Sequence, residues 1–293
     1  MEIRQLRYFC AIAREGTFVK AAEAEGVSQP SLSQQIRKLE DELGVPLFDR
    51  LGRGLKLTSY GLSLYERAQD ILRRTAEAER EIQSLSQGVS GTLRVGCIPT
   101  ILPYFLAPNL SDFNGRYPEA DIQIVERRTS RLVEQMQAGE LDLAVIALPV
   151  EGDDLLVREL FREPLLAALS PSHPLVGRGA VSLSALESEK MLLLREGHCL
   201  RNDVLTGCRQ SQVRFVNLFE SDNLASIFAL VSAGAGSSIV PQMAASAAGG
   251  CKLAPIQEPV VRRIGYARVK GHFVSPLQKV FTDWLKTRAP QSN

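Results

Sequence analysis

The sequence predicts an α+β protein built from several domains. Its 293 residues exceed the size of one ordinary domain, which holds roughly 100 to 200 residues. In the first 58 residues, the spacing of apolar residues predicts short helices followed by a hairpin. Beyond residue 90, segments with a strand pattern alternate with segments with a helix pattern. With 45% hydrophobic and 23% charged residues, the composition is that of a globular protein and excludes a disordered or collagen-like chain.

Three short helices are expected at the amino terminus. Apolar side chains recur at helical spacing over residues 3–14, and Thr17 is a candidate N-cap for a second helix over residues 18–25. Gly26 can adopt the positive φ of a tight turn, and Ser28 is a candidate N-cap for a third helix. The expected buried stripe of that third helix comprises Leu32, Ile36, Leu39 and Leu43. This pattern is typical of a helix-turn-helix.

Two further elements follow before the α/β region. Residues 47–58 indicate a β-hairpin with a basic tip, and residues 59–87 indicate one long helix. At 1.5 Å per residue this helix would span about 43 Å, which is too long for a compact domain but suits a linker helix that pairs with another helix. Residues 87–91, rich in Gly and Ser, are expected to form a linker.

The exposed face of the third helix is a candidate DNA-reading surface. Hydroxyl and amide side chains can bond base edges in a major groove, and arginines can contact phosphates. The candidates on or beside the helix are Ser28, Gln29, Pro30, Ser31, Ser33, Gln34 and Arg37, and the hairpin tip adds Arg50 and Arg53. A helical subunit interface with a polar outer face would give the same spacing. A net charge of +1 does not decide between them, because binding depends on where the charge lies.

The remaining 200 or so residues predict parallel α/β sheet in two lobes. The expected strands are 93–98, 122–126, 143–147, 164–169, 191–194, 213–218, 237–240 and 262–269, and the expected helices are 102–117, 130–138, 223–233 and 276–287. Ligands bind at the carboxyl ends of parallel strands, which points to Thr100, Thr129 and the segment 197–199.

Several amino-terminal segments closely resemble the LysR-type transcriptional regulators. They are residues 1–9, 17–18, 21–22, 27–33, 36–39 and 43–50, and the likeness extends over the whole chain. The resemblance implies a winged helix-turn-helix over 1–58, a dimerising linker helix and hinge over 59–90, and an effector domain over 91–293. That effector domain would resemble periplasmic binding proteins, with lobe I at about 91–161 and 267–293 and lobe II at about 162–266. The implied partners are double-stranded promoter DNA, further copies in a homodimer or homotetramer, and RNA polymerase.

Cys199 and Cys208 are the candidate signal-receiving residues. His198, Arg201 and an expected helix N-terminus would favour the thiolate of Cys199, which is the nucleophilic form. If the segment between the two cysteines is helical, their Cα atoms lie about 13 Å apart, whereas a disulfide needs less than about 7 Å. The pair could bond only after a rearrangement, which is what a redox switch requires.

The segment Gly-His-Cys-Leu-Arg at 197–201, with a second cysteine at 208, resembles peroxide-sensing members of the same family. The resemblance implies that Cys199 reacts with hydrogen peroxide and that Cys208 then forms the disulfide. It also implies that Thr100 and Thr129 hold peroxide or water against Cys199, while His198 and Arg201 shape the electrostatics. The chain departs from those relatives at Asn202, where they usually have Asp, and by a shortened segment after Cys208.

Two alternatives to a peroxide switch fit the same residues. Relatives with this fold bind small aromatic or carboxylic acids between the lobes, and Thr100 with the first-lobe loops would then form the site. The two cysteines could also be ordinary buried thiols. Cys10 and Cys97 fall on apolar periods and are expected in the core, whereas Cys251 is expected on a loop.

An enzyme is not expected, and neither is a cofactor or a metal. The chain has three histidines without metal-site spacing, no Walker-type phosphate loop and no Gly-x-Ser-x-Gly motif. The amino terminus lacks the apolar core of a signal peptide, and no apolar run approaches the roughly 18 residues that cross a bilayer. Five cysteines are an odd number, unlike a secreted disulfide framework. We therefore expect a cytoplasmic protein with no membrane partner.

Overall fold

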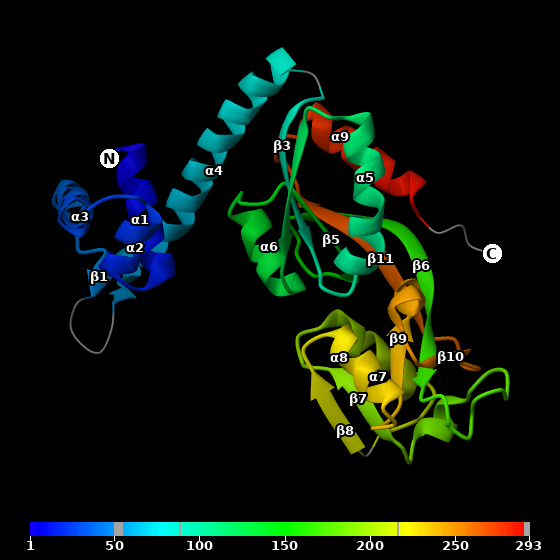
Figure 1. Ribbon diagram of the computed structural model, residues 1–293. Helices are drawn as coiled ribbons and strands as arrows, with labels where there is room; N and C mark the ends of the chain where they lie inside the picture. The colour runs from blue at the N-terminus through cyan, green and yellow to red at the C-terminus, as the bar shows by residue number, and fades with distance from the viewer. Residues whose placement is uncertain (50–54, 88, 216, 290–293) are drawn as a thin grey trace. The chain divides into compact units, whose positions relative to one another are not determined.

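The computed structural model describes residues 1–49, 55–87, 89–215 and 217–289. The chain divides into two compact units, Met1–Gln83 and Ser84–Asn293 (Figure 1). The first unit holds helices and one hairpin, and the second combines helices with a sheet. The predicted α+β class is therefore confirmed.

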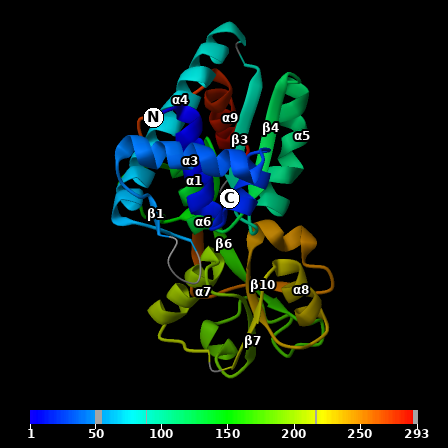
Figure 2. The ribbon, with the colours of Figure 1, turned by 90° about the vertical axis from the view of Figure 1, so that its left-hand side faces the viewer.

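The first unit is a helix-turn-helix with a hairpin and a long helix. Its elements are α1 (Ile3–Glu15), α2 (Phe18–Ala24), α3 (Gln29–Leu43), β1 (Phe48–Asp49), β2 (Lys56–Leu57) and α4 (Ser59–Gln87). Both predicted N-caps form, because Thr17 accepts a hydrogen bond from the Lys20 N–H and Ser28 accepts one from the Ser31 N–H. Figure 2 shows α3 running across the front of α1. The hairpin strands pair in antiparallel register, while the predicted basic tip falls outside the described residues.

The core of this unit confirms three of the four positions predicted for α3. Leu32, Ile36 and Leu39 are fully buried, together with Phe9 of α1. Leu43 is 40% exposed, so the prediction of a fourth buried residue is wrong. Leu43 is the last residue of the helix, and the chain turns away at the next residue, which has a left-handed φ of 71°.

The second unit is built around one seven-stranded sheet. The strand order is β10-β6-β11-β5-β3-β4, and β9 also pairs with β6. These strands are β3 (Gly91–Cys97), β4 (Ala120–Glu126), β5 (Leu143–Leu148), β6 (Leu155–Leu169), β9 (Ser238–Pro241), β10 (Lys252–Pro255) and β11 (Val261–Val269). The remaining strands, β7 (Lys190–Leu194) and β8 (Asn217–Ser221), form a separate parallel pair.

The sheet is mixed, not wholly parallel as predicted. β3 pairs in parallel with β4 and β5, but β11 pairs antiparallel with both β5 and β6. The prediction failed because β6 is longer than the expected 164–169 and begins at Leu155, in a stretch whose charged residues hid the strand pattern. In Figure 1, β6 and β11 run side by side from one part of this unit into the other.

Helices cover the strands in both parts of the unit. They are the π-helix Leu102–Leu106, α5 (Ala107–Arg116), α6 (Thr129–Gln137), the short 3-10 helices Leu183–Leu186 and Gln242–Ala247, α7 (Cys199–Gln210), α8 (Leu224–Ser232) and α9 (Pro276–Thr287). The single helix expected over 102–117 is thus two elements. Pro108 has no N–H to continue the α-helical ladder at this point.

Two apolar cores lie in the second unit. One surrounds β3 and β5 and includes the aromatic cluster of Phe113, Phe281 and Trp284, and the other surrounds β7, α7 and α8. The strand expected over 213–218 starts later, at Asn217. The Val213 N–H instead donates to the Cys208 carbonyl, 2.9 Å away, and so closes the end of α7.

Candidate redox site and DNA-reading helix

Cys199 is the first residue of α7 and lies where the two cores meet. It follows strand β7 by a short turn in which Gly197 has a φ of 90°. The Cys199 Sγ atom lies 3.0 Å from the Thr129 Oγ1 atom, within hydrogen-bond distance. Thr129 is the first residue of α6. The Cys199 side chain is half-buried and packs against the core around β3 and β5, although its own helix belongs to the other core.

A buried arginine lies beside this cysteine. Arg262 of β11 is fully buried, and its Nη2 atom donates a hydrogen bond to the Thr100 hydroxyl, 2.7 Å away. Thr100 lies in the turn after β3 and is buried as well. Burial lowers the pKa of Arg262, an effect that nearby Glu163, Asp203 and the Cys199 sulfur oppose. The fold therefore brings Thr100, Thr129 and Cys199 into one site, and Arg262 joins them.

Two carboxylates face the same guanidinium. The Glu163 Oε1 atom lies 3.6 Å from Arg262 Nη1, and the Asp203 Oδ2 atom lies 3.7 Å from Arg262 Nε. Burial raises the pKa of Glu163 above its ordinary value, and it raises the pKa of Asp203 to about 6. Both acids are thus easier to protonate than surface carboxylates.

His198 and Arg201 flank Cys199 with different partners. His198 is the N-cap residue of α7 and is buried. Burial lowers its pKa, the Arg128 guanidinium lowers it further, and Asp222 opposes both, so the imidazole is neutral near pH 7. The Arg201 Nη1 atom donates to the Leu194 carbonyl at 3.1 Å and to the Glu220 carboxylate at 2.6 Å. Buried Arg262, by contrast, interacts electrostatically with the Cys199 sulfur.

Arg128 connects the turn before α7 to the other part of the unit. It is the residue before α6, and its Nη1 atom donates to the Glu196 carbonyl at 3.1 Å. Its Nη2 atom lies 3.6 Å from Asp222, which also pairs with Arg195 at 3.2 Å. A side chain at position 197 would approach the Arg128 guanidinium, because a Cβ there would lie 3.1 Å from its Nη1 atom.

Cys208 lies in the same helix as Cys199 and is buried. Because α7 is helical from Cys199 to Gln210, the nine-residue separation corresponds to about 13 Å, beyond the reach of a disulfide. Burial, with Glu258 nearby, raises the pKa of Cys208 to about 11. Among the other cysteines, Cys97 is fully buried and Cys10 packs against the core of its unit, while the Cys251 thiol donates to the Phe228 carbonyl at 3.2 Å.

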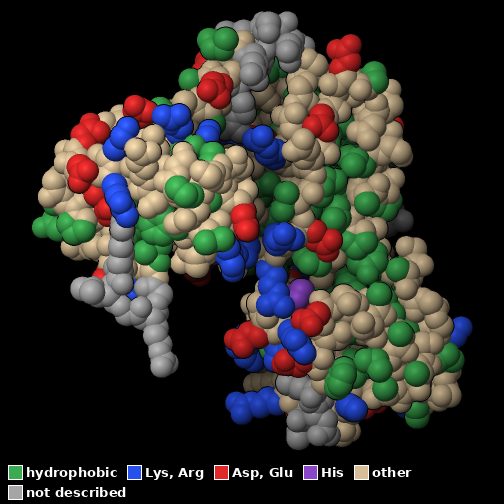
Figure 3. All heavy atoms as spheres, turned by 60° about the vertical axis from the view of Figure 1, so that its left-hand side comes forward, with side chains coloured by type: hydrophobic (Ala, Val, Ile, Leu, Met, Phe, Trp, Pro, Cys, Tyr) green, Lys and Arg blue, Asp and Glu red, His purple; other side chains and the backbone are tan. Residues whose placement is uncertain are grey.

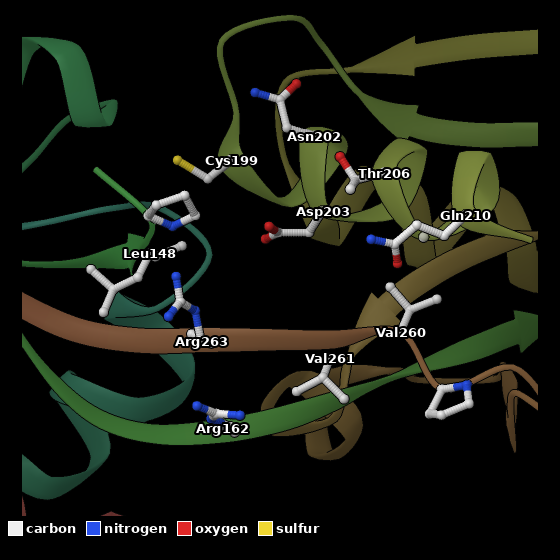
Figure 4. Close-up of a pocket in the computed structure, with 14 residues that line it drawn as sticks. Leu148, Arg162, Cys199, Asn202, Asp203, Thr206, Gln210, Val260, Val261 and Arg263 are labelled. Atoms are coloured by element: carbon white, nitrogen blue, oxygen red, sulfur yellow. The ribbon is translucent and has the colours of Figure 1, made fainter. Parts of the chain in front are cut away.

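A cavity of about 490 Å³ opens between α7, β6, β11 and the end of β5, with Cys199 at one side (Figure 4). Figure 4 shows Asp203 and Asn202 projecting from α7, and Arg162 and Arg263 lying opposite them on β6 and β11. The remaining labelled lining residues are Leu148, Thr206, Gln210, Val260 and Val261. The side of the cavity formed by β5, β6 and β11 therefore carries both apolar residues and two arginines, and it faces polar side chains of α7.

The proposed DNA-reading face of α3 is open to solvent. Ser28, Gln29, Pro30, Ser31, Gln34 and Arg37 are exposed, and Ser33 is partly exposed. Arg50 and Arg53, the hairpin candidates, lie outside the described residues. On the face seen in Figure 3, acidic and basic side chains are interspersed in both units, in keeping with a net charge of +1.

Sequence reasoning missed Arg262, Glu163 and Arg128. Arg262 lies two residues before Ile264 and four before Tyr266, and alternate residues of a strand face the same side. Because Ile264 and Tyr266 are buried, this alternation could have indicated that Arg262 is buried too. The neighbouring Arg263 obscured it, because paired arginines suggest a solvated strand edge. Within the described part of the chain, no group of three or more His, Cys, Asp or Glu could hold a metal ion, and no helix is long and apolar enough to cross a membrane.

A helix-turn-helix joined by a long helix to a two-core α/β unit defines a DNA-binding transcriptional regulator of bacterial type. Residues 3–62 match the bacterial regulatory helix-turn-helix proteins of the lysR family, and residues 86–290 match the LysR substrate binding domain. The chain belongs to the LysR family.

The relatives and solved structures to which the chain is similar include proteins described as peroxide-inducible activators or as OxyR. A hydrogen peroxide-inducible genes activator from Dickeya chrysanthemi is 36% identical over 244 residues, covering 83% of this chain and 80% of that protein. A full-length OxyR variant from Pseudomonas aeruginosa has a TM-score of 0.74 at 29% identity, covering 100% of this chain and 99% of that one. A cysteine-to-serine mutant of Corynebacterium glutamicum OxyR with hydrogen peroxide bound has a TM-score of 0.64 at 32% identity, covering 98% and 94%.

Proposed function

We propose that this LysR-family regulator senses hydrogen peroxide through Cys199 and answers by forming a Cys199–Cys208 disulfide. The observation that carries the proposal is the Cys199 Sγ atom, 3.0 Å from the Thr129 hydroxyl and electrostatically coupled to buried Arg262. A cation favours the thiolate, and a hydroxyl at this distance can hold a peroxide oxygen against it. The peroxide-inducible activators and OxyR structures to which the chain is similar support the same function.

The first step oxidises Cys199. Its thiolate attacks one oxygen of hydrogen peroxide, so that an S–O bond forms as the O–O bond breaks. The second oxygen leaves as hydroxide and takes up a proton to become water. The sulfur loses two electrons to the peroxide and becomes a sulfenic acid. In this step Thr100 and Thr129 border the peroxide, while His198 and Arg201 shape the surroundings of the sulfur.

The second step requires α7 to unwind. The Cys208 thiolate attacks the sulfenic acid sulfur, the S–S bond forms as the S–O bond breaks, and the leaving hydroxide is protonated to a second water. Cys208 is buried with a raised pKa, and α7 holds it about 13 Å from Cys199. Disulfide formation therefore cannot precede rearrangement, and this rearrangement is the signal. Cellular dithiols reverse it, so the reaction is stoichiometric and no substrate is turned over.

The output of the switch is a change in promoter binding. The exposed face of α3 from Ser28 to Arg37, with Arg50 and Arg53 of the hairpin, reads double-stranded promoter DNA in the major groove. The protein acts in the cytoplasm as a homodimer or homotetramer joined through α4, and oxidation alters its contact with RNA polymerase.

Mapping the thiols of the full-length protein tests this function. One equivalent of hydrogen peroxide should give a Cys199–Cys208 disulfide by peptide mass mapping and should change the DNA footprint. Cys208→Ser should accumulate a sulfenic acid at Cys199, trapped by dimedone, and Cys251→Ser should behave as the wild type. Both thiols remaining free after peroxide would overturn the proposal.

The cavity beside Cys199 favours a second candidate, a regulator that binds a small organic acid. Arg162 and Arg263 can pair with a carboxylate, and Leu148 and Val260 can contact an apolar ring or chain. This candidate predicts that a Cys199→Ser/Cys208→Ser double variant is still stabilised thermally by one or more aromatic or aliphatic acids. No shift across a broad panel of acids would count against it.

A further inference from the structure

Each nitrogen of the Arg262 guanidinium faces a different group. Nη2 donates to Thr100 at 2.7 Å, Nη1 lies 3.6 Å from Glu163, and Nε lies 3.7 Å from Asp203. Among the described residues, Nη1 and Nε have no hydrogen-bond partner, and neither do the facing oxygens of the two acids. The two carboxylates are therefore paired with the cation by charge and not held by short hydrogen bonds.

The cluster contains more acidic groups than basic ones. Arg262 is the one guanidinium in contact with Glu163 and Asp203 in the part of the chain that the structure describes, and the Cys199 sulfur interacts with it electrostatically too. Arg262 is fully buried, so solvent screens these interactions little. Three groups that can become anions thus compete for one buried positive charge.

We propose that Asp203 is a positioning residue that restrains Cys199, because its carboxylate competes with the cysteine thiolate for Arg262. This inference rests on the proposed function of Cys199 as the reacting thiol. Asp203 lies on the same helix as Cys199, one turn further on, and both line the cavity of Figure 4. Glu163 acts in the same direction but less strongly, since its Oε2 atom accepts a hydrogen bond from the Met243 N–H at 3.0 Å.

The charged groups around Asp203 determine how the restraint depends on pH. Arg262 and Arg263 face it from β11, Glu163 faces it from β6, and Cys199 lies on its own helix. Burial raises the pKa of Asp203 to about 6 despite both arginines. Above pH 6 the carboxylate is charged and holds Arg262. Below it the acid is neutral, and a larger share of the arginine's positive charge acts on Cys199.

The alkylation rate of Cys199 should therefore fall less steeply on acidification in the wild type than in a variant that lacks the Asp203 carboxylate. An isolated thiol loses about tenfold in reactive form for each pH unit below its titration range. Protonation of Asp203 offsets part of this loss as pH falls through about 6, because the neutral acid no longer pairs with the Arg262 charge.

Alkylation of Cys199 in the full-length protein tests the proposal. Iodoacetamide labelling is followed by the mass of the Cys199 peptide, so the other cysteines do not interfere. Asp203→Asn should label about three- to tenfold faster than the wild type at pH 7. The wild-type profile should be shallower between about pH 5 and 7 than the Asp203→Asn profile, in which only the weaker effect of Glu163 remains.

Two further variants separate charge from structure. Glu163→Gln should also speed labelling, by a smaller factor. Glu159→Gln is the control, because Glu159 lies on β6 like Glu163 but pairs with Arg162 and Arg263 and not with Arg262. It should change the labelling rate less than twofold. Equal acceleration in all three variants, or parallel wild-type and Asp203→Asn profiles, would overturn the inference. A mere loss of fold in Asp203→Asn would speed Cys208 labelling too, which the same mass spectra report.

Failure of this inference can be told from failure of the proposed function. Alkylation reads the thiol of Cys199 directly and uses no peroxide. If the pH profiles behave as described while peroxide forms no disulfide, the restraint by Asp203 stands and peroxide sensing fails. If peroxide forms the disulfide while Asp203→Asn leaves the alkylation profile unchanged, only the restraint by Asp203 fails.

Discussion

The Cys199 Sγ atom and the Thr129 Oγ1 atom lie 3.0 Å apart although 70 residues separate them in the chain. Thr129 begins α6 and Cys199 begins α7, and the two helices belong to different apolar cores of the same unit. The contact therefore joins the two parts of this unit at the Cys199 sulfur. A displacement of Cys199 away from the start of α6 would break it.

Loss of the Thr129 hydroxyl should slow the oxidation of Cys199 without unfolding the protein. Thr129→Val keeps the shape of the side chain but removes the group that can hold a peroxide oxygen. We expect the second-order rate with hydrogen peroxide to fall by about tenfold, the loss of roughly one hydrogen bond. Thr129→Ser keeps the hydroxyl and should stay within about threefold of the wild type. Stopped-flow measurement of thiol loss checks both, and an unchanged rate in Thr129→Val would remove Thr129 from the site.

Close packing between α7 and Val260, the residue before β11, should make Gly207 intolerant of a side chain. A Cβ at this position would lie 2.6 Å from one methyl carbon of Val260 and 2.7 Å from the other. We expect Gly207→Ala to lower the free energy of unfolding by about 1–3 kcal/mol, the usual cost of overpacking. Gly115→Ala is the matched control, because Gly115 also lies in a helix and a Cβ there would meet nothing within 4 Å. That control should raise stability slightly. Urea unfolding of reduced protein measures both, and equal stability of the two variants would show that α7 yields easily.

Asp203 should make stability depend on pH in the opposite direction to the surface acids. Its pKa is raised from the ordinary value of 3.8 to about 6 on folding, so the folded state binds the proton more tightly than the unfolded chain does. This contribution is fully present below about pH 4 and is lost as pH rises through about 6. Asp203→Asn removes it.

The measurement is therefore a difference between two proteins. The stability of Asp203→Asn relative to wild type should increase by about 1–3 kcal/mol between pH 4 and pH 7. The comparison is needed because other acids titrate in both proteins. Hydrogen bonds from arginine or tryptophan lower the pKa values of Asp70 and Asp112, so their contribution to the stability of the folded protein is lost as pH falls. A relative stability that stays flat over this range would mean that Asp203 titrates normally.

Local periodicity was enough to predict the helices of the first unit and the alternation of the second, because neighbours in sequence decide both. The rule that ligands bind at the carboxyl ends of strands pointed to Thr100, Thr129 and the segment 197–199, and the family resemblance implied that they share one site. Arg262 and Glu163 could not be predicted in the same way. Their burial depends on the antiparallel pairing of β6 with β11, which joins nine pairs of residues. No local sequence pattern encodes such a long-range pairing.

Contacts to DNA should be visible in the salt dependence of binding. Arg37 is exposed on α3, in the helix whose polar face is the candidate reading surface. Arg37→Ala should weaken binding to duplex DNA and should lower the slope of log affinity against log salt by about 0.9 if the guanidinium contacts one phosphate. Arg116→Ala, which removes an exposed arginine of α5, should leave the slope unchanged. Identical slopes for Arg37→Ala and the wild type would place Arg37 away from the phosphates.

Oxidation should unfold α7 before anything else in the regulatory unit. The helix holds Cys199 and Cys208 about 13 Å apart, so a disulfide between them cannot coexist with the hydrogen bonds of residues 199–210. Hydrogen exchange followed by mass spectrometry should show that peroxide removes protection from the α7 peptides, while α9 keeps its protection. Cys208→Ser should retain protected α7 after peroxide, because the sulfenic acid alone imposes no such constraint. Cys251→Ser should follow the wild type. A disulfide that forms while α7 stays protected would require partners from two different chains, and the intramolecular switch would then be wrong.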